Sequence, residues 1–155
     1  MRRSTKTSVL GLIAAIVALA AMLFSGSAMA QGPIGIGFAQ AEEGTWWCRG
    51  DNTVETLDCA RDRCEAEAGG QECLRTAWCY PAGWSGLMTV WLGEFHTTEI
   101  VCGAPSRGAL EAALDGFCVA NAFAVSCDTF LFIDPEGNEI DAFLSFTGPA
   151  GDIAP

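Results

Sequence analysis

The cysteines of this 155-residue chain constrain its fold more than any other feature. There are eight of them, and three recur at a fixed offset of 54 residues. The matched pairs are Cys48 and Cys102, Cys64 and Cys118, and Cys73 and Cys127. A fixed spacing of this kind is the sequence signature of an internal repeat. The sequence therefore predicts two copies of one small unit, held together by disulfides.

Residues 1–30 have the three-part pattern of a secretory signal peptide. Three basic side chains lie in the first eight residues, an uncharged apolar run covers Val9 to Phe24, and small residues precede a cleavage site after Ala30. The apolar run has 16 residues, fewer than the roughly 20 of a membrane-spanning helix. An uncleaved anchor is the alternative. Because many cysteines in a short chain are typical of oxidising compartments, we expect a secreted or periplasmic protein without a membrane span after cleavage.

Removal of the leader would leave a strongly acidic chain. Residues 31–155 contain 19 carboxylates, five arginines and no lysine, which gives a net charge of −14. Such a surface repels phosphate backbones and anionic lipids, and this excludes nucleic acid as an expected partner. Basic proteins or cations are the partners that the charge favours.

Two helix signals alternate with short β-prone runs. We expect helices over 54–64 and 109–117, the first capped by Asn52 or Thr53 and the second by Ser106. The β-prone runs are 45–48, 72–80, 87–95, 98–102, 123–133 and 139–146. The predicted fold class is α+β, with two strand–helix–strand–strand units that form an antiparallel sheet with both helices on one face.

The expected domain organisation follows from these elements. Glycine is conformationally permissive, so the glycine-rich stretch that follows the leader is expected to be flexible, and the last residues are expected to be disordered. The predicted segments are a signal peptide at 1–30, a flexible segment at 31–44, one disulfide-rich domain at 45–147 with repeats 45–96 and 97–147, and a disordered tail at 148–155.

Eight cysteines allow roughly a hundred pairings, and sequence alone does not select one. The repeat narrows the choice if matched cysteines bond in matched ways, and Cys59 and Cys79 are then left as partners because they have no counterparts. The predicted bridges are Cys48–Cys102, Cys59–Cys79, Cys64–Cys73 and Cys118–Cys127. Each bridge that closes a loop of 10 to 20 residues stabilises the fold by roughly 2.5–3.5 kcal/mol.

One segment resembles a known class of domain. Residues 105–114 read Pro-Ser-Arg-Gly-Ala-Leu-Glu-Ala-Ala-Leu, and Cys118 and Cys127 follow. This pattern is similar to short exported bacterial domains of unknown function, in which a strand, an alanine-rich helix ending in cysteine and a β segment opened by another cysteine follow one another. Those domains commonly have a further cysteine after the second β segment; Cys79 matches it in the first copy, and Ile133 replaces it in the second. The resemblance implies a fold and an exported location, but no activity.

No motif for catalysis, metal or cofactor binding is present. His96 lies between Glu94 and Glu99, where an acid–base or metal role is conceivable, but a lone histidine between strands is typical of a surface. The stretch 83–86 lacks the spacing of a nucleophile elbow, and the acidic run 134–141 lacks the glycine and glutamate of a calcium loop. Without a Cys-x-x-Cys pair, zinc or redox chemistry is not indicated. We therefore predict no catalytic residue, metal or cofactor.

The tryptophans suggest a contact surface. All five lie in the first copy, and Trp84 follows a Pro-Ala-Gly turn, where burial is hard to arrange. Large flat side chains with a polar group suit partner contacts. We predict that Trp84 and Tyr80 form an exposed binding pair.

The function expected from these features is that of an exported, non-enzymatic binding or inhibitor-type module. Its partner would be a basic protein, such as a cell-wall lytic enzyme or a protease. The alternatives are a small cell-wall hydrolase that uses paired carboxylates and a structural envelope component. The oligomeric state does not follow from the sequence.

Overall fold

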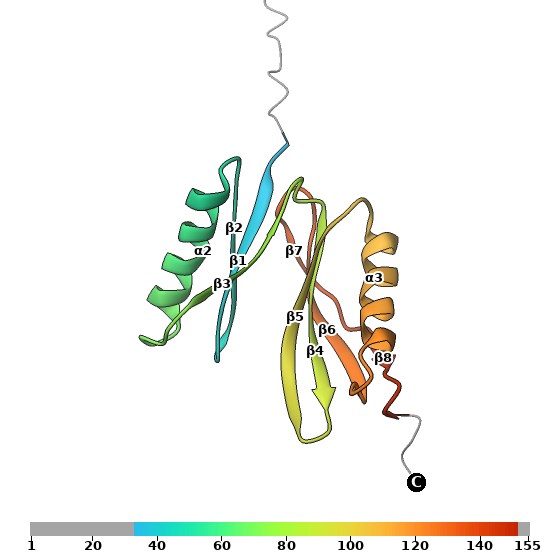
Figure 1. The fold of residues 1–155 in the computed structure, drawn as a ribbon. Coiled ribbons are helices and arrows are strands. Elements are labelled where there is room, and N and C mark those ends of the chain that lie inside the picture. The colour runs from blue at the N-terminus through green and yellow to red at the C-terminus, as the bar shows by residue number, and fades with distance from the viewer. Residues whose placement is uncertain (1–32, 152–155) are drawn as a thin grey trace, which may run out of the picture. The chain divides into compact units, whose positions relative to one another are not determined.

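The computed structural model describes residues 33–151. The predicted signal peptide at 1–30 and the last part of the predicted tail, 152–155, lie outside the described residues. The described part contains two helices and eight strands (Figure 1). In chain order these are β1 Gly35–Ala41, β2 Gly44–Gly50, α2 Thr53–Glu67, β3 Leu74–Cys79, β4 Trp84–Leu92, β5 Phe95–Ala104, α3 Arg107–Ala120, β6 Ser126–Ile133, β7 Glu139–Asp141 and β8 Ser145–Thr147.

The strands form two antiparallel sheets. The first has the order β2-β1-β3, and the second has the order β5-β4-β6-β7, with β8 also pairing with β6. The α+β class, the antiparallel pairing and the two helices are as predicted. The single sheet is wrong, because two sheets are present.

Three buried clusters show how the layers pack. One lies between α2 and the first sheet and contains Ala39 and Ala60. A second joins the two sheets through Phe38 and Leu87. A third lies between α3 and the second sheet and contains Leu114. Each sheet thus buries one face against a helix and the other against its partner sheet, so the helices lie on two outer faces and not on one (Figure 1).

The two halves of the chain share one topology. β1-β2-α2-β3 and β4-β5-α3-β6 have the same element order, and in both the first strand lies between the other two. Both also have a register irregularity at the matched step, between Phe38 and Ala39 and between Leu87 and Met88. The repeat is therefore strand–strand–helix–strand, and the predicted boundaries at 45 and 97 cut through the two hairpins.

The predicted flexible segment at 31–44 is wrong where the structure describes it, because β1 is the central strand of the first sheet. Its glycines are required for close packing. A Cβ on Gly35 would lie 2.1 Å from the ring of Trp78, and one on Gly37 would lie 3.1 Å from Leu57 of α2. The predicted disordered tail is likewise wrong for residues 148–151, since the N–H of Gly148 donates to Val125 O at 3.0 Å.

The helix starts follow the capping rule. The side chain of Asn52 accepts the N–H groups of Val54 at 2.9 Å and Glu55 at 3.1 Å, and Ser106 accepts that of Ala109 at 3.2 Å. Side-chain oxygens thereby satisfy N–H groups that have no partner within the helix. Both predicted helices are confirmed and extend further than expected.

The last predicted strand, 139–146, is divided into β7 and β8 by a buried hydroxyl. Thr129 donates its hydroxyl to Ala142 O at 2.6 Å, and the same oxygen accepts the N–H of Leu144 at 2.8 Å. The side chain replaces ladder hydrogen bonds at this point, so the strand is interrupted.

All eight cysteines form disulfides. The bridges are Cys48–Cys59, Cys64–Cys73, Cys79–Cys102 and Cys118–Cys127. The two bridges that join a helix end to the next strand are as predicted. The predictions Cys48–Cys102 and Cys59–Cys79 are wrong.

A bulge in β5 explains the error. In the first hairpin Cys48 lies opposite Gly37, whereas in the second Val101, and not Cys102, lies opposite Gly86. The extra residue is Gly103. Its φ is +81°, a value that glycine adopts without strain. Because neighbouring strand residues face opposite sides of a sheet, Cys48 faces α2 and bonds to Cys59. Cys102 faces the first sheet and bonds to Cys79.

Polar contacts also join the halves. Arg49 of β2 donates to the carbonyls of Pro135 and Glu136, and Trp47 Nε1 donates to Glu139 at 2.9 Å. No helix within residues 33–151 has the length and apolar character needed to cross a membrane.

Candidate functional site

The predicted pair Tyr80 and Trp84 is not uniformly exposed. Tyr80 is 55% exposed and stacks on Trp78, with ring centroids 6.4 Å apart. Trp84 is half-buried, because it is the first residue of β4 and packs against the cluster under α3. The chain enters the sheet directly after the Pro-Ala-Gly turn, so Trp84 is a strand residue. That this pair binds a partner stays a prediction.

Three other tryptophans anchor acidic side chains. The indole N–H groups of Trp46, Trp47 and Trp91 donate to the carboxylates of Glu67, Glu139 and Asp128, at 2.7, 2.9 and 2.8 Å. The partners are 21 to 92 residues apart in the chain, so no local sequence signal could have revealed them.

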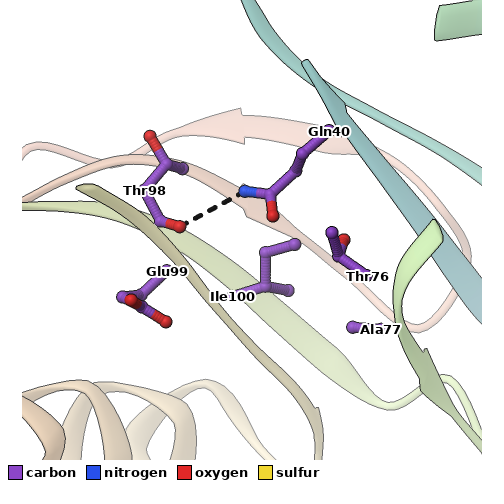
Figure 2. Close-up of a pocket in the computed structure, with 6 residues that line it drawn as sticks. All are labelled: Gln40, Thr76, Ala77, Thr98, Glu99 and Ile100. Atoms are coloured by element: carbon purple, nitrogen blue, oxygen red, sulfur yellow. Dashed lines mark hydrogen bonds between the residues drawn. The ribbon is translucent and has the colours of Figure 1, made fainter. Parts of the chain in front are cut away.

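A polar groove lies between β1 and β3 of the first sheet and β5 of the second (Figure 2). One cavity of about 180 Å³ is lined by Gln40, Thr76, Ala77, Thr98, Glu99 and Ile100. A second, of about 400 Å³, is lined by Gln40, Ala41, Glu42, His96, Thr97 and Thr98. Since the cavities share Gln40 and Thr98, we treat them as one inter-sheet groove. Sequence reasoning missed it because β1, which supplies Gln40, was not predicted.

Two local features build the groove. The amide Nε2 of Gln40 donates to Thr98 O at 3.2 Å and so ties β1 to β5 across it (Figure 2). Thr76 is the extra residue of a β-bulge, because Phe38 pairs with Ala77 and Ala39 pairs with Arg75. Bulges are common beside functional sites because they redirect side chains. The lining contains hydroxyls, an amide, an imidazole and two carboxylates, with few apolar side chains.

His96, the histidine noted in the sequence, lies at this groove. Its ring is 5.1 Å from that of Trp91, and the imidazole is exposed. Among residues 33–151 no three histidine, cysteine or acidic side chains come together in a way that could hold a metal ion.

The acidic run at 134–141 is a turn followed by β7. The carboxylate of Asp134 accepts the side-chain amide of Asn138 at 2.7 Å and the backbone N–H groups of Asn138 and Glu136 at 2.8 and 2.9 Å. These hydrogen bonds, the Asn138 amide first, lower the pKa of Asp134 below its ordinary value of 3.8. Polar residues are frequent here because their hydrogen bonds hold the turn.

Every arginine of the described residues is held by the chain itself. Arg61, Arg75 and Arg107 pair with carboxylates, and Arg49 and Arg63 donate to backbone carbonyls. The ion pairs use Asp58, Asp62, Glu65 and Glu111. Residues 33–151 contain 18 carboxylates, so 14 of them have no cationic partner within this part of the chain. The negative field of the domain is therefore largely uncompensated.

Comparison with protein-family models, with curated proteins and with solved structures found no match. The function must therefore be argued from the chemistry of the chain.

Proposed function

We propose that this protein is an exported, disulfide-stapled binding module for a basic protein. The observation that carries the proposal is the set of 14 carboxylates without a cationic partner, in a part of the chain whose five arginines are all engaged internally. A field of one sign speeds the encounter with a partner of opposite charge and rejects partners of the same charge.

The covalent frame supports the same proposal. Four disulfides within residues 33–151 hold both helices and both sheets. A frame fixed before binding loses less conformational entropy when the complex forms, and this favours affinity. Disulfides also suit an oxidising compartment, which agrees with the signal-like residues 1–30 and with the resemblance to exported domains.

The test is binding to basic enzymes that cleave cell-wall glycans or peptide bonds. The purified, oxidised domain would be immobilised and exposed to such enzymes and to an acidic protein of similar size, at low and high salt. We expect binding of basic proteins alone, with an affinity that falls as salt rises. Binding that ignores both charge and salt would contradict the proposal.

A second candidate is a small glycan hydrolase, and one feature of the groove favours it. Glu42 follows a strand of the first sheet and Glu99 belongs to the second, and they line adjoining parts of the groove. Glycoside hydrolysis uses two carboxyl groups on opposite sides of the bond that is cleaved. Release of reducing sugar from cell-wall glycan, abolished in both Glu42→Gln and Glu99→Gln, would support this candidate. Equal release by the wild type and both variants would contradict it.

A further inference from the structure

Five exposed apolar side chains belong to elements that end close together at one end of the second half. Figure 1 shows the backbone of this end. The side chains come from the β4–β5 hairpin, the last turn of α3 and the loop before β6. The N–H of Val125 donates to Trp91 O at 2.8 Å, which brings the loop to the hairpin, and Leu92 pairs with Phe95 at the hairpin tip. The residues of this surface, which we call the aromatic end, are Phe95, Phe117, Val119, Phe123 and Val125.

The exposure of this surface is large. Phe95 is 76% exposed, Phe123 is 78% exposed and Val119 is 56% exposed. Single exposed apolar residues are ordinary, but a group of them at one place marks an interaction surface.

The first half of the chain provides an internal control. At the offset that superimposes the helices, the places of Phe117, Val119, Phe123 and Val125 are taken by Arg63, Glu65, Gly69 and Gln71. The same strand–strand–helix–strand frame therefore forms with polar or small residues at these positions. The first half thus packs this frame without apolar side chains at these four positions.

The surroundings of the aromatic end are acidic. Glu94 is exposed at the hairpin tip, and Asp115 is exposed one helical turn before Val119. Arg107 is the one arginine among residues 84–151, and it pairs with Glu111 at 2.8 Å. It lies at the start of α3, roughly 20 Å from the helix end that contributes to this surface.

We propose that the aromatic end is the contact surface for the basic partner. The partner would present apolar side chains flanked by lysine or arginine. The inference rests on the proposed function and adds the location and chemistry of the contact. A second copy of this chain is a poor occupant because residues 33–151 have a net charge of −13, and an anionic membrane is repelled for the same reason. Apolar contacts at the centre and charges at the rim are the usual arrangement of a protein interface.

Two synthetic peptides serve as probes. One is a short amphipathic helix with a leucine face and a lysine face, and the other has the same charge with serine in place of leucine. Titrations would use the oxidised wild type, the double variant Phe95→Ser/Phe123→Ser, and the controls Val54→Ser and Leu74→Ser. Val54 and Leu74 are 61% and 60% exposed and belong to the first half, so each control removes exposed apolar area at another place on the domain.

We expect the wild type to bind the leucine–lysine peptide at least about tenfold more tightly than the serine peptide, and the double variant to lose that difference. Both controls should keep it. Near-ultraviolet circular dichroism would check that every variant keeps its packing.

Three other results would overturn the inference. If the wild type binds both peptides equally, the contact is purely electrostatic. The proposed function then still holds, but the aromatic end is not the contact surface. If it binds neither peptide nor any basic protein, the proposed function fails as well. Dimerisation that the double variant abolishes would identify a second copy as the occupant.

Discussion

The two halves of this domain have equivalent helices, α2 and α3. Each half holds its helix against its own sheet by a different means. At three matched positions facing its sheet, α2 has Thr56, Ala60 and Cys64, whereas α3 has Leu110, Leu114 and Cys118. The first helix has small residues there and a second covalent bond, Cys48–Cys59, that its counterpart lacks.

The energies of the two solutions are of the same order. A bridge that closes a loop of 11 residues contributes about 2.7 kcal/mol in the chain-entropy model. Each buried leucine contributes roughly 1.5–3 kcal/mol relative to an exposed one. The comparison teaches that, in this frame, a disulfide can replace apolar burial under a helix.

The largest expected effect is that of Leu114→Ala, which gives α3 the residue that α2 has at Ala60. Without a compensating bridge, the cavity should lower the free energy of unfolding by about 2 to 5 kcal/mol. Guanidinium denaturation measures this loss. Phe117→Ala on the same helix, where the side chain is 38% exposed, is the control and should cost less. Equal losses would mean that burial is not what holds α3.

Removal of the first-half bridge should come next in size. Cys48→Ser/Cys59→Ser should lower the free energy of unfolding by about 2.5–3 kcal/mol. Because the bridge joins β2 to α2, amide hydrogen exchange should speed up in α2 while α3 keeps its protection. If both helices lost protection equally, they would not be held independently.

The caps should have the same, smaller effect in both halves. Asn52→Ala and Ser106→Ala each remove a side-chain acceptor at a matched helix start. We expect a loss of about 1 kcal/mol for each, measured by thermal or chemical unfolding. If the two substitutions lowered the free energy of unfolding by clearly different amounts, the two helix starts would not be equivalent.

The smallest effect concerns the Asp134 turn. Since hydrogen bonds lower the pKa of Asp134 in the folded state, its contribution is complete above its ordinary pKa and is lost as pH falls through the lower folded-state pKa. Asp134→Asn should therefore weaken the dependence of stability on pH below about pH 4. Unfolding curves across the acidic range measure this. If the stability of the variant depended on pH as steeply as that of the wild type, other carboxylates would be responsible for the dependence.

The parts of the fold that sequence predicts best are those governed by local rules. The helices were found because Asn52 and Ser106 cap them and because Leu110 and Leu114 recur at helical spacing. The duplication was found from cysteine spacing. β1 was missed because glycine usually signals flexibility, and only the tertiary contacts of Gly35 with Trp78 and of Gly37 with α2 reveal why glycine is needed there.

The candidate sites were harder to predict, since they depend on which strands meet. The inter-sheet groove needs Gln40 beside Thr98, residues from different halves. For the aromatic end, the sequence contains one signal: the second copy has phenylalanine at positions where the first copy has other residues. That contrast is the sequence signal for the proposed contact surface.

The bulge at Gly103 also determines how the two sheets are linked. Shortening β5 by that single residue would rotate the thiol of Cys102 away from Cys79 and towards α3. The halves would then be covalently continuous through the backbone alone, with two reduced sulfurs left in separate layers. The length of one strand thus decides whether the duplicated units are cross-linked to each other or only within themselves.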